Sequence, residues 1–466
     1  MTAPAPSAYL LLEDGTRFDG DSCGAPLPGA GASTDLRSTG EVVFTTGMSG
    51  YQESVTDPSF AGQLIVFTYP HIGNYGVNAA AMESDRIHSR AVIMREAVDR
   101  DDAPRAEQGW LSWLAENGIP AISGVDTRAL VRHIRDKGAM RGGVFAGEVP
   151  QDEAAATVAA EPSMAGQDLA STVTPAQAHT VSRPGQLRGT GDAGSTGDVP
   201  DGNANGPLIA AIDTGIKWSI VEELVARGAR VRLHPLSDGP DAVLEGDVDA
   251  VFLANGPGDP GAVDHVVETI RGVLGKKPVF GICMGHQLLC RAVGLETFKM
   301  EFGHRGANHP VKDLTTGRVE ITSQNHGFAV QTPDGTGRIE GDEPVRWDTD
   351  FGQAELSHLN LYDRTVEGLV LAEANAATVQ YHPEAAPGPN DAGYLFDRFL
   401  DRIREGGSLA DVNRQTGDAA AAKAGVAADG TTPAEAAIAG ESAGTSATGS
   451  TDGPTATDTT TDGSAA

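Results

Sequence analysis

Short apolar runs alternate with amphipathic segments over residues 207–405 of this 466-residue chain. Runs such as "PLIAAID", "DAVFLANG" and "KPVFGIC" have the length of buried strands, and "VDHVVETIRGVLG" repeats its apolar residues with a helical period. This alternation predicts βαβ units, and so a parallel sheet with helices on both faces. In such a sheet, functional side chains gather at the carboxyl ends of the strands.

The first 150 residues have a different pattern. The β-branched runs "EVVFTTG", "QLIVFTYP" and "RAVIMREAV" are separated by Gly, Pro and Asn turns, and "DTRALVRHIRDKG" has the apolar spacing of an amphipathic helix. We therefore expect a mixed α/β domain over residues 1–150. The predicted fold class is α/β, with this domain followed by the parallel-sheet domain at 207–405.

Two segments lack the apolar residues that a core needs. Residues 151–206 are predicted to be an interdomain linker, because their last part, 183–206, is a Gly/Asp-rich insertion. Residues 406–466 form an acidic, low-complexity tail of mainly Ala, Gly, Thr and Asp. Such a tail cannot bury enough apolar surface to offset the entropy of ordering, so we expect it to be disordered.

The charge balance limits the environment and the partners. Asp and Glu number 64 against 34 Lys and Arg, and only seven of the basic residues are Lys. A strongly acidic, Lys-poor surface predicts a halophilic source and disfavours nucleic acid or an anionic membrane as partner. Three cysteines are too few for a disulfide framework, and the N-terminus does not resemble a signal peptide. We therefore expect a cytoplasmic protein.

The segment "VFGICMGHQLLC", residues 279–290, carries the first chemical signal. A predicted strand ends at Cys283 and a helix begins directly after it. The helix N-terminus favours a thiolate, and its N–H groups can bind an oxyanion that forms beside the sulfur. A buried cysteine without a chemical role is the commoner alternative for a lone cysteine, and it fits Cys290 and Cys23.

Two further motifs follow predicted strands. "ATVQYHPEAAPGP" places His382 and Glu384 at the end of one strand, and a thiol nucleophile needs both a base and an acceptor that orients the base. "FLANGPGDPG" follows another strand, where the N–H of Gly258 can serve as a second oxyanion donor. Each motif alone also fits an ordinary turn. Together they predict a catalytic triad of Cys283, His382 and Glu384.

The motifs "GICMGHQLL", "NGPGDP" and "HPE", in this order, resemble the class I, triad-type glutamine amidotransferases. The resemblance implies that Cys283 attacks the side-chain amide of L-glutamine, that ammonia leaves, and that water hydrolyses a γ-glutamyl thioester. The stretches "GEVVFTTGMSGYQESVTDPSFAGQLIVFTYPHIGNYGVN" and "SGVDTRALVRHIRDKGAMRGGV" resemble the N-terminal domain of the carbamoyl-phosphate synthase small-subunit family. Residues 8–405 are covered by the resemblance.

This family resemblance implies a large-subunit partner in a heterodimer. The partner would use ATP and Mg to make carbamoyl phosphate for arginine and pyrimidine biosynthesis, and this chain itself would hold no cofactor. The absence of a Walker-type loop from the sequence agrees with that expectation. The alternatives are an amidotransferase subunit of the anthranilate or GMP type, a non-catalytic regulatory scaffold, and a cysteine peptidase on a similar fold. The N-terminal domain disfavours the first, the complete triad the second, and the "HPE" and "NGPGDP" motifs the third.

The resemblance also implies a glutamine pocket. The family often has Ser at the position of Gly47 and Leu at that of Met284, so these two positions depart from its pattern. We expect no metal site, because the spacings of the histidines fit no zinc pattern and the carboxylates near them are expected to lie on the surface. The histidines considered are His286, His304, His309 and His326, and the implied glutamine-binding residues are Gly47, Gly256, Gly258, Met284, Gln287, Asn325, Gly327 and Phe328.

Overall fold

The computed structural model describes residues 7–27, 29, 38–189, 203–341 and 345–409. Residues 190–202 of the predicted insertion and 410–466 of the predicted tail lie outside the described part of the chain. Among the described residues, no helix has the length and apolar character needed to cross a membrane.

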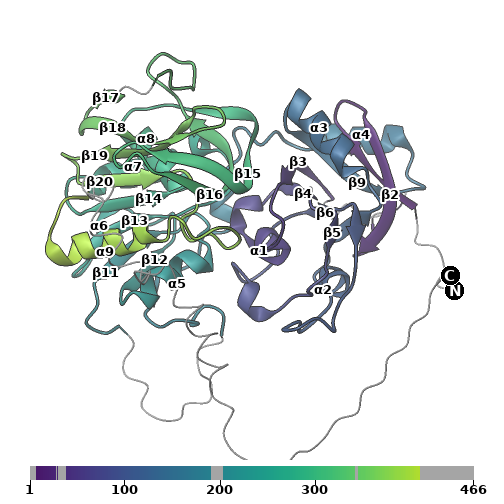
Figure 1. Cartoon of the computed structure of the whole chain (residues 1–466), viewed down its shortest axis with the longest axis horizontal. Coiled ribbons are helices and arrows are strands. Elements are labelled where there is room, and N and C mark those ends of the chain that lie inside the picture. The colour runs from purple at the N-terminus through teal and green to yellow at the C-terminus, as the bar shows by residue number, and fades with distance from the viewer. Residues whose placement is uncertain (1–6, 28, 30–37, 190–202, 342–344, 410–466) are drawn as a thin grey trace, which may run out of the picture. The chain divides into compact units, whose positions relative to one another are not determined.

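The N-terminal strands close into a β-barrel (Figure 1). Neighbouring strands from β3 to β8 run parallel, and the remaining pairs are antiparallel. The sequence indicated a mixed α/β domain but not that its sheet closes. The barrel order is β1 (Ser7–Leu12), β2 (Arg17–Gly24), β8 (Pro120–Ser123), β6 (Ala91–Ile93), β4 (Gln63–Phe67), β3 (Thr39–Thr45) and β9 (Met140–Ala146), while β5 (His71–Ile72) pairs with β7 (Glu96–Ala97).

Alternate residues of the barrel strands enter different apolar clusters, as the period of two along a strand requires. Val42 and Leu64 pack with the predicted amphipathic helix α3 (Thr127–Lys137). Their neighbours Val43 and Ile65 pack with α1 and α2. The helices α1 (Tyr51–Thr56), α2 (Trp110–Glu116) and α4 (Gln151–Ala160) and the short 3-10 helices η1 (Pro58–Phe60) and η2 (Ala79–Ala81) complete this part.

The described C-terminal strands form one 11-stranded sheet. Its β12, β11, β13, β14 and β20 run parallel, as predicted, whereas β10 at one edge and the strands beyond β20 are antiparallel. The order is β10 (His179–Val181), β12 (Arg230–His234), β11 (Leu208–Ile212), β13 (Ala250–Leu253), β14 (Val279–Ile282), β20 (Ala376–Val379), β19 (Val366–Leu371), β18 (Gly352–Asn360), β15 (Thr297–Asp313) and β16 (Val319–Val330), with β17 (Arg346–Thr349) paired to β18.

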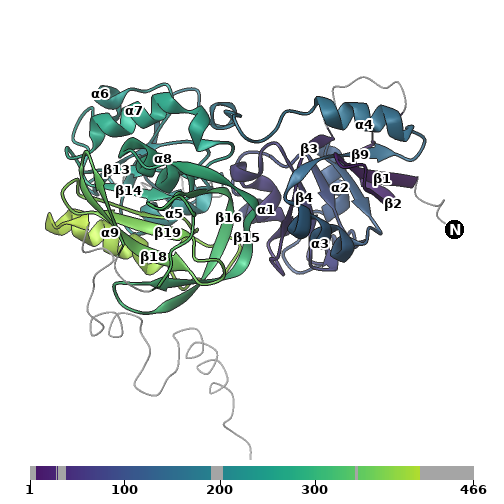
Figure 2. The same cartoon turned by 90° about the horizontal axis from the view of Figure 1, so that it is seen from above.

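Helices cover both faces of the parallel strands, which confirms the predicted arrangement (Figure 2). One apolar cluster joins the sheet to α7 (Asp264–Val273) and α8 (Met284–Ala292). The other joins it to α5 (Trp218–Ala226) and α9 (Tyr394–Glu405). The short helices α6 (Pro240–Val243), η3 (Ala170–Thr172) and η4 (Pro260–Ala262) lie in connections.

The segment predicted as a linker, 151–206, contains regular structure. Helix α4 packs its Ala154 and Val158 against the barrel, and β10 pairs with β12 at the sheet edge. Arg188 donates hydrogen bonds to the backbone carbonyl oxygens of Ala80 and Met82. These contacts attach the segment to both domains. An alanine-rich helix and a single arginine can do this even though the segment has little apolar surface. The exact domain boundaries stay a prediction.

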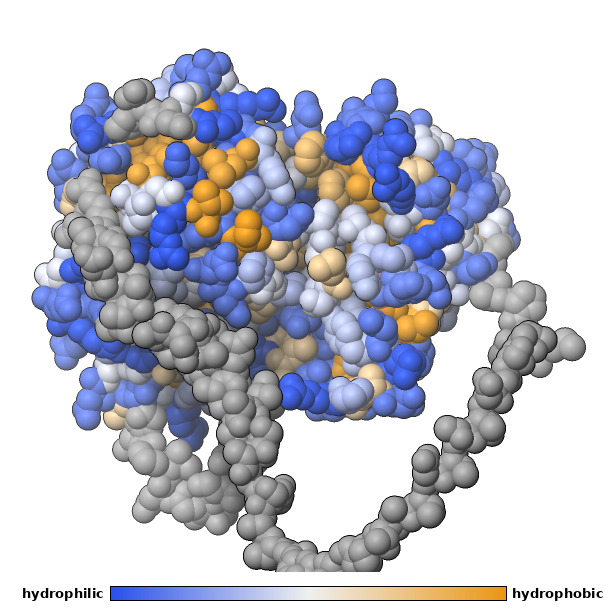
Figure 3. All heavy atoms as spheres, viewed as in Figure 1, coloured by the Kyte–Doolittle hydropathy of each residue, from blue (hydrophilic) through white to orange (hydrophobic). Residues whose placement is uncertain are grey.

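The surface in view is mostly hydrophilic, with small apolar patches (Figure 3). Val319, Ile321, Leu361 and Tyr362 are among the exposed large hydrophobic residues, and Tyr362 is 61% exposed. Ile321 and Leu361 lie on either side of Pro310 of β15, because Ile321 pairs with Pro310 and the N–H of Leu361 donates to the Pro310 carbonyl oxygen. A group of exposed apolar side chains of this kind is typical of a surface that contacts another protein.

Candidate active site

Cys283 occupies the corner between β14 and α8. Its φ is 54° and its ψ is −106°, a backbone conformation that costs a residue other than glycine of order 1–3 kcal/mol. The corner is held by the N–H of Cys283, which donates to the carbonyl oxygen of Val379 on β20 at 2.9 Å. The buried sulfur lies 3.6 Å from the carbonyl oxygen of Asn325. Strain of this kind at a turn between a strand and a helix is typical of a nucleophile elbow.

The glycines on either side of Cys283 allow the close packing of this corner. A Cβ added at Gly285 would lie 2.2 Å from the carbonyl oxygen of Leu253, and one at Gly281 would lie 2.9 Å from the backbone of Gly285. Neither space admits a side chain. Helix α8 can therefore start directly against the sheet, with its N-terminus at the sulfur.

His382 and Glu384 form a buried, hydrogen-bonded pair. His382 Nδ1 donates to Glu384 Oε1 at 2.6 Å. Burial lowers the pKa of His382, but the charges of Glu384 and Cys283 outweigh burial and raise this pKa to about 10. Burial raises the pKa of Glu384, but Lys217 and His382 outweigh it and lower this pKa to about 2. Both shifts favour an imidazolium paired with a carboxylate.

Lys217 is a part of this site that sequence reasoning missed. Its Nζ donates to Glu384 Oε1 at 2.9 Å and to the carbonyl oxygen of Ala385 at 2.7 Å. Burial disfavours its charged form, but Glu384, Glu83 and Asp57 outweigh burial and raise its pKa. Lys217 is 167 residues from Glu384 in sequence. The available signal was its place after β11, at the edge where the other parallel strands end.

We predict that Lys217→Met destabilises the protein. The substitution leaves the buried Glu384 with His382 as its remaining cationic neighbour, and removing one partner of a buried ion pair costs about 3 kcal/mol. Urea unfolding measures the effect as the difference in unfolding free energy between Lys217→Met and the control Lys276→Met. Lys276 is an exposed lysine after α7. Equal stability of the two variants would show that the ammonium group does not stabilise the Glu384 carboxylate.

The loop after β13 has a conformation that requires glycine. Gly258 has a φ of 92°, and a Cβ there would lie 2.7 Å from the carbonyl oxygen of Gln167. The loop is braced by Asp259, whose carboxylate accepts the N–H groups of Gly166 and Gly261. The predicted oxyanion donor, Gly258, therefore lies in a rigid loop that lines the same pocket as Cys283.

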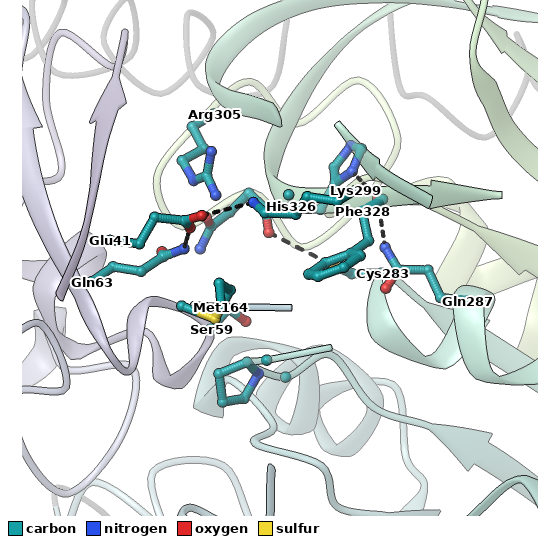
Figure 4. A pocket seen from close by; sticks show the side chains of 15 residues that line it. Glu41, Ser59, Gln63, Met164, Cys283, Gln287, Lys299, Arg305, His326 and Phe328 are labelled. Carbon is teal, nitrogen blue, oxygen red and sulfur yellow. Dashed lines mark hydrogen bonds and ion pairs between the residues drawn. The ribbon is translucent and has the colours of Figure 1, made fainter. Parts of the chain in front are cut away.

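The pocket at Cys283 brings together most of the residues implied for glutamine binding (Figure 4). Gln287 helps to hold its wall, because its Nε2 donates to the carbonyl oxygen of Phe328 at 2.8 Å and to Gln380 Oε1 at 3.1 Å. The predicted residues that line this pocket are Gly256, Gly258, Gln287, Asn325, Gly327 and Phe328.

The other two predicted residues lie elsewhere. The Met284 side chain is buried in the apolar core, so only its backbone N–H can serve the site. Gly47 lines a neighbouring pocket with Lys217 and His382, and Asn325 is shared by the two pockets. The position of Gly47 follows from the closure of the barrel, which a sequence pattern does not specify.

Asn325 connects the barrel to the site. Its side-chain Nδ2 donates to Asp57 Oδ2 at 2.8 Å, and Asp57 caps the 3-10 helix η1. The amide is therefore directed to the barrel, while the backbone carbonyl oxygen lies beside the Cys283 sulfur. Asn325 thus connects the backbone beside the Cys283 sulfur to the N-terminal domain.

A histidine cluster offers the geometry closest to a metal site. Ligand atoms of His304, His326 and Glu367 lie within 4.8 Å of one another. We expected only surface carboxylates here, and this was wrong, because Glu367 is fully buried on β19. Its two oxygens accept hydrogen bonds from Asn360 at 2.7 Å and Gln324 at 2.9 Å. Hydrogen-bond donors of the protein already occupy both oxygens of the Glu367 carboxylate. That this chain binds no metal therefore stays our prediction.

His304 gives the stability a pH dependence that can be measured. Burial lowers its pKa, but Asp363 and Glu367 outweigh burial and raise the pKa to about 9. The neighbouring His309 and His326 have pKa values lowered by burial, and that of His309 is about 4, so they stay neutral above pH 6. A raised pKa contributes stability that is fully present below pH 6.5 and is lost as the pH rises through 9.

We therefore expect the stability difference between the wild type and His304→Gln to shrink by about 2–3 kcal/mol between pH 6 and pH 10. Denaturant unfolding of both proteins at the two pH values measures it. The exposed His265→Gln serves as the control and should show no such change. A pH-independent difference would show that His304 is not held as an imidazolium.

A thiol at a strained corner between a strand and a helix, with a histidine–carboxylate pair beside it on a sheet covered by helices, has the arrangement of a triad enzyme with a cysteine nucleophile. Residues 210–402 match the family model for glutamine amidotransferase class-I. Residues 10–144 match the model for the carbamoyl-phosphate synthase small chain, CPSase domain. The chain belongs to the carbamoyl phosphate synthase small chain family.

Relatives match over nearly their whole length. The chain is 44% identical to the carbamoyl phosphate synthase small chain of Streptomyces coelicolor, over 84% of this chain and 95% of the relative. It is 42% identical to that of Rhodopirellula baltica, over 87% and 98%. A solved glutamine amidotransferase from Thermotoga maritima is 16% identical over 38% of this chain and 76% of that chain, with a TM-score of 0.28. That distant likeness adds nothing to the assignment, which depends on the sequence relatives.

Proposed function

We propose that this chain is the glutaminase subunit of a glutamine-hydrolysing carbamoyl-phosphate synthase. The observation that carries the proposal is the buried Cys283 at its strained corner, beside the His382–Glu384 pair and open to a pocket. The match of residues 10–144 to the carbamoyl-phosphate synthase small chain, CPSase domain, disfavours an anthranilate or GMP type amidotransferase. The complete set of reactive groups disfavours a silent scaffold, and the "NGPGDP" and "HPE" motifs disfavour a cysteine peptidase.

The first half-reaction forms a thioester. The Cys283 thiolate attacks the carbon of the side-chain amide of L-glutamine, and the carbonyl oxygen becomes an oxyanion. The N–H groups of Gly258 and Met284 are the donors proposed to stabilise it. His382, protonated and oriented by Glu384, gives its proton to the nitrogen, so the C–N bond breaks and ammonia leaves.

The second half-reaction returns the enzyme. His382 is neutral after giving its proton away, and it takes a proton from a water molecule that attacks the thioester carbon. The C–S bond then breaks, glutamate leaves and the Cys283 thiolate forms again beside the protonated His382. Glu384 stays charged throughout, because the pKa of its buried carboxyl is held low by Lys217 and His382.

The ammonia is proposed to pass to a large subunit in a heterodimer. That partner would bind ATP and Mg and convert bicarbonate and ammonia to carbamoyl phosphate for arginine and pyrimidine biosynthesis. The exposed apolar group of Val319, Ile321, Leu361 and Tyr362 is one surface suited to such a contact. A cytoplasmic location fits a catalytic thiol, and the cysteines Cys23, Cys283 and Cys290 are free.

The test uses the purified full chain with glutamine, bicarbonate, ATP and Mg²⁺. We expect slow release of glutamate and no carbamoyl phosphate. Addition of the co-expressed large subunit should speed glutamate release and start carbamoyl phosphate formation. Robust synthesis of carbamoyl phosphate by this chain alone would overturn the subunit assignment.

A further inference from the structure

Helix α5 begins beside the triad without a cap of its own. Its N-cap residue is Lys217, whose side chain makes no capping hydrogen bond and donates to Glu384 instead. A lysine has no acceptor for the N–H groups of the first turn, and a positive charge at a helix N-terminus is unfavourable. The start of α5, and with it the position of Lys217, must therefore depend on another element.

Glu83, in the barrel domain between η2 and β6, supplies the missing cap. Its carbonyl oxygen accepts the N–H of Trp218 at 2.9 Å, and its Oε2 accepts the N–H of Ser219 at 3.2 Å. Its Oε1 accepts the Ser219 hydroxyl at 2.5 Å. Glu83 is 1% exposed. It therefore takes the place of an N-cap side chain, although it belongs to a different domain.

Arg188 also holds the Glu83 carboxylate. Its Nη2 donates to Glu83 Oε1 at 3.3 Å and to Ser219 Oγ at 3.2 Å, while its Nη1 donates to the carbonyl oxygen of Met82 at 2.6 Å. Burial raises the pKa of Glu83, and Lys217 is the largest of the influences that oppose this rise. The carboxylate thus lies near two cations, one of which is the lysine at the triad.

The ammonium group of Lys217 decides how Glu384 is oriented. Lys217 Nζ and His382 Nδ1 both donate to Glu384 Oε1, at 2.9 Å and 2.6 Å. Glu384 Oε2 has no hydrogen-bond partner among the described residues. The ammonium group therefore holds the same oxygen that orients the imidazole ring. Displacement of Lys217 would leave the carboxylate free to rotate away from His382.

We propose that Glu83 is a positioning residue for the triad. It caps α5 from the barrel domain and so fixes Lys217, which in turn fixes the Glu384 oxygen that orients His382. This inference rests on the proposed glutaminase function and adds a residue of the N-terminal domain to it. Glu83 is not among the residues that line the pocket at Cys283, so its loss should lower kcat and leave KM unchanged.

The first test is kinetic. Glu83→Ala should lower kcat for glutamine hydrolysis about 10- to 100-fold, because a small misplacement of a catalytic group has an effect of this size. The loss should stay partial, since the backbone N–H of Lys217 also donates to Asn255 Oδ1 at 3.1 Å. The KM for glutamine should change less than about twofold. A wild-type kcat, or a loss confined to KM, would overturn the proposal.

Glu107→Ala is the matched control. Glu107 is an exposed glutamate of the barrel domain, and it accepts the N–H of Ala79 at the start of η2. It has the same kind of contact as Glu83 but none with α5, so this variant should keep the wild-type kcat and KM. An equal loss of kcat in Glu107→Ala would show that the effect is not specific to Glu83 and would overturn the proposal.

Two milder variants separate the cap from folding. Glu83→Gln keeps an oxygen that can accept the N–H of Ser219, and it should recover most of the kcat lost in Glu83→Ala. If it is as inactive as Glu83→Ala at a wild-type thermal midpoint, the capping role is wrong. Should Glu83→Ala not fold, Ser219→Ala removes one bond to Glu83 and should lower kcat about threefold with KM unchanged. A wild-type kcat in Ser219→Ala would then refute the proposal.

The second test asks whether Glu83 acts through Lys217. In the Lys217→Met background no ammonium group is left to position, so adding Glu83→Ala should change kcat less than about twofold. A full loss in that background would overturn the proposal. In urea unfolding, the midpoint of the double variant should fall by less than the sum of the two single falls. If the protein hydrolyses no glutamine, the proposed function fails and these midpoints decide alone: additive falls refute the coupling of Glu83 to Lys217, and smaller falls keep it.

Discussion

Cys283→Ser is expected to abolish glutamine hydrolysis, with a loss of about 10⁴-fold or more in kcat. The elbow places the N-terminus of α8 at the sulfur, and His382 lies beside it. A serine hydroxyl does not ionise under these conditions, so the same groups leave it a poor nucleophile. Glutamate release at saturating glutamine measures the loss.

Cys23→Ser is the matched control, because Cys23 lies on β2 of the barrel, outside the pocket. It should keep wild-type activity. In the assembled enzyme, Cys283→Ser should keep synthesis from added ammonia, since only the source of ammonia is lost. A Cys283→Ser complex that used glutamine at the wild-type rate would show that the nucleophile is another residue.

His382→Asn is expected to be the next most damaging change, with a loss of about 10²- to 10⁴-fold in kcat. In the proposed mechanism, His382 moves the proton in both half-reactions, whereas Glu384 orients the ring of His382 and stabilises its protonated form. Glu384→Gln should therefore cost less. It should also lower the pH at which His382 loses its proton, because the Glu384 carboxylate is the larger of the two charges that raise this pKa.

The measurement is the pH dependence of kcat/KM for the wild type and Glu384→Gln, with His382→Asn as the comparison at pH 7.5. His265→Asn, at an exposed histidine of α7, is the control for histidine loss and should stay active. Two observations would contradict the assigned roles: a fully active His382→Asn, or a Glu384→Gln profile with no shift.

The pattern of apolar residues predicted the parallel strands of the C-terminal domain well, because such strands are buried on both faces and are continuously apolar. It predicted α3 and α7 from their helical spacing. It did not predict the antiparallel half of the sheet, whose strands β15 and β16 contain bulges and many polar residues. The halophilic source and the cytoplasmic location, both derived from composition, stay predictions.

The local sequence by itself determined the turn at Cys283, because glycines flank a cysteine between an apolar run and a helix, and it placed His382 and Glu384 after a neighbouring strand. Only the tertiary structure brought Lys217 to Glu384, Asp57 to Asn325, and Glu41 to Lys299. Each of these pairs joins residues far apart in the chain. Their charges meet only because the barrel closes and the parallel strands end at one edge, and such long-range geometry leaves no periodic signal in a sequence.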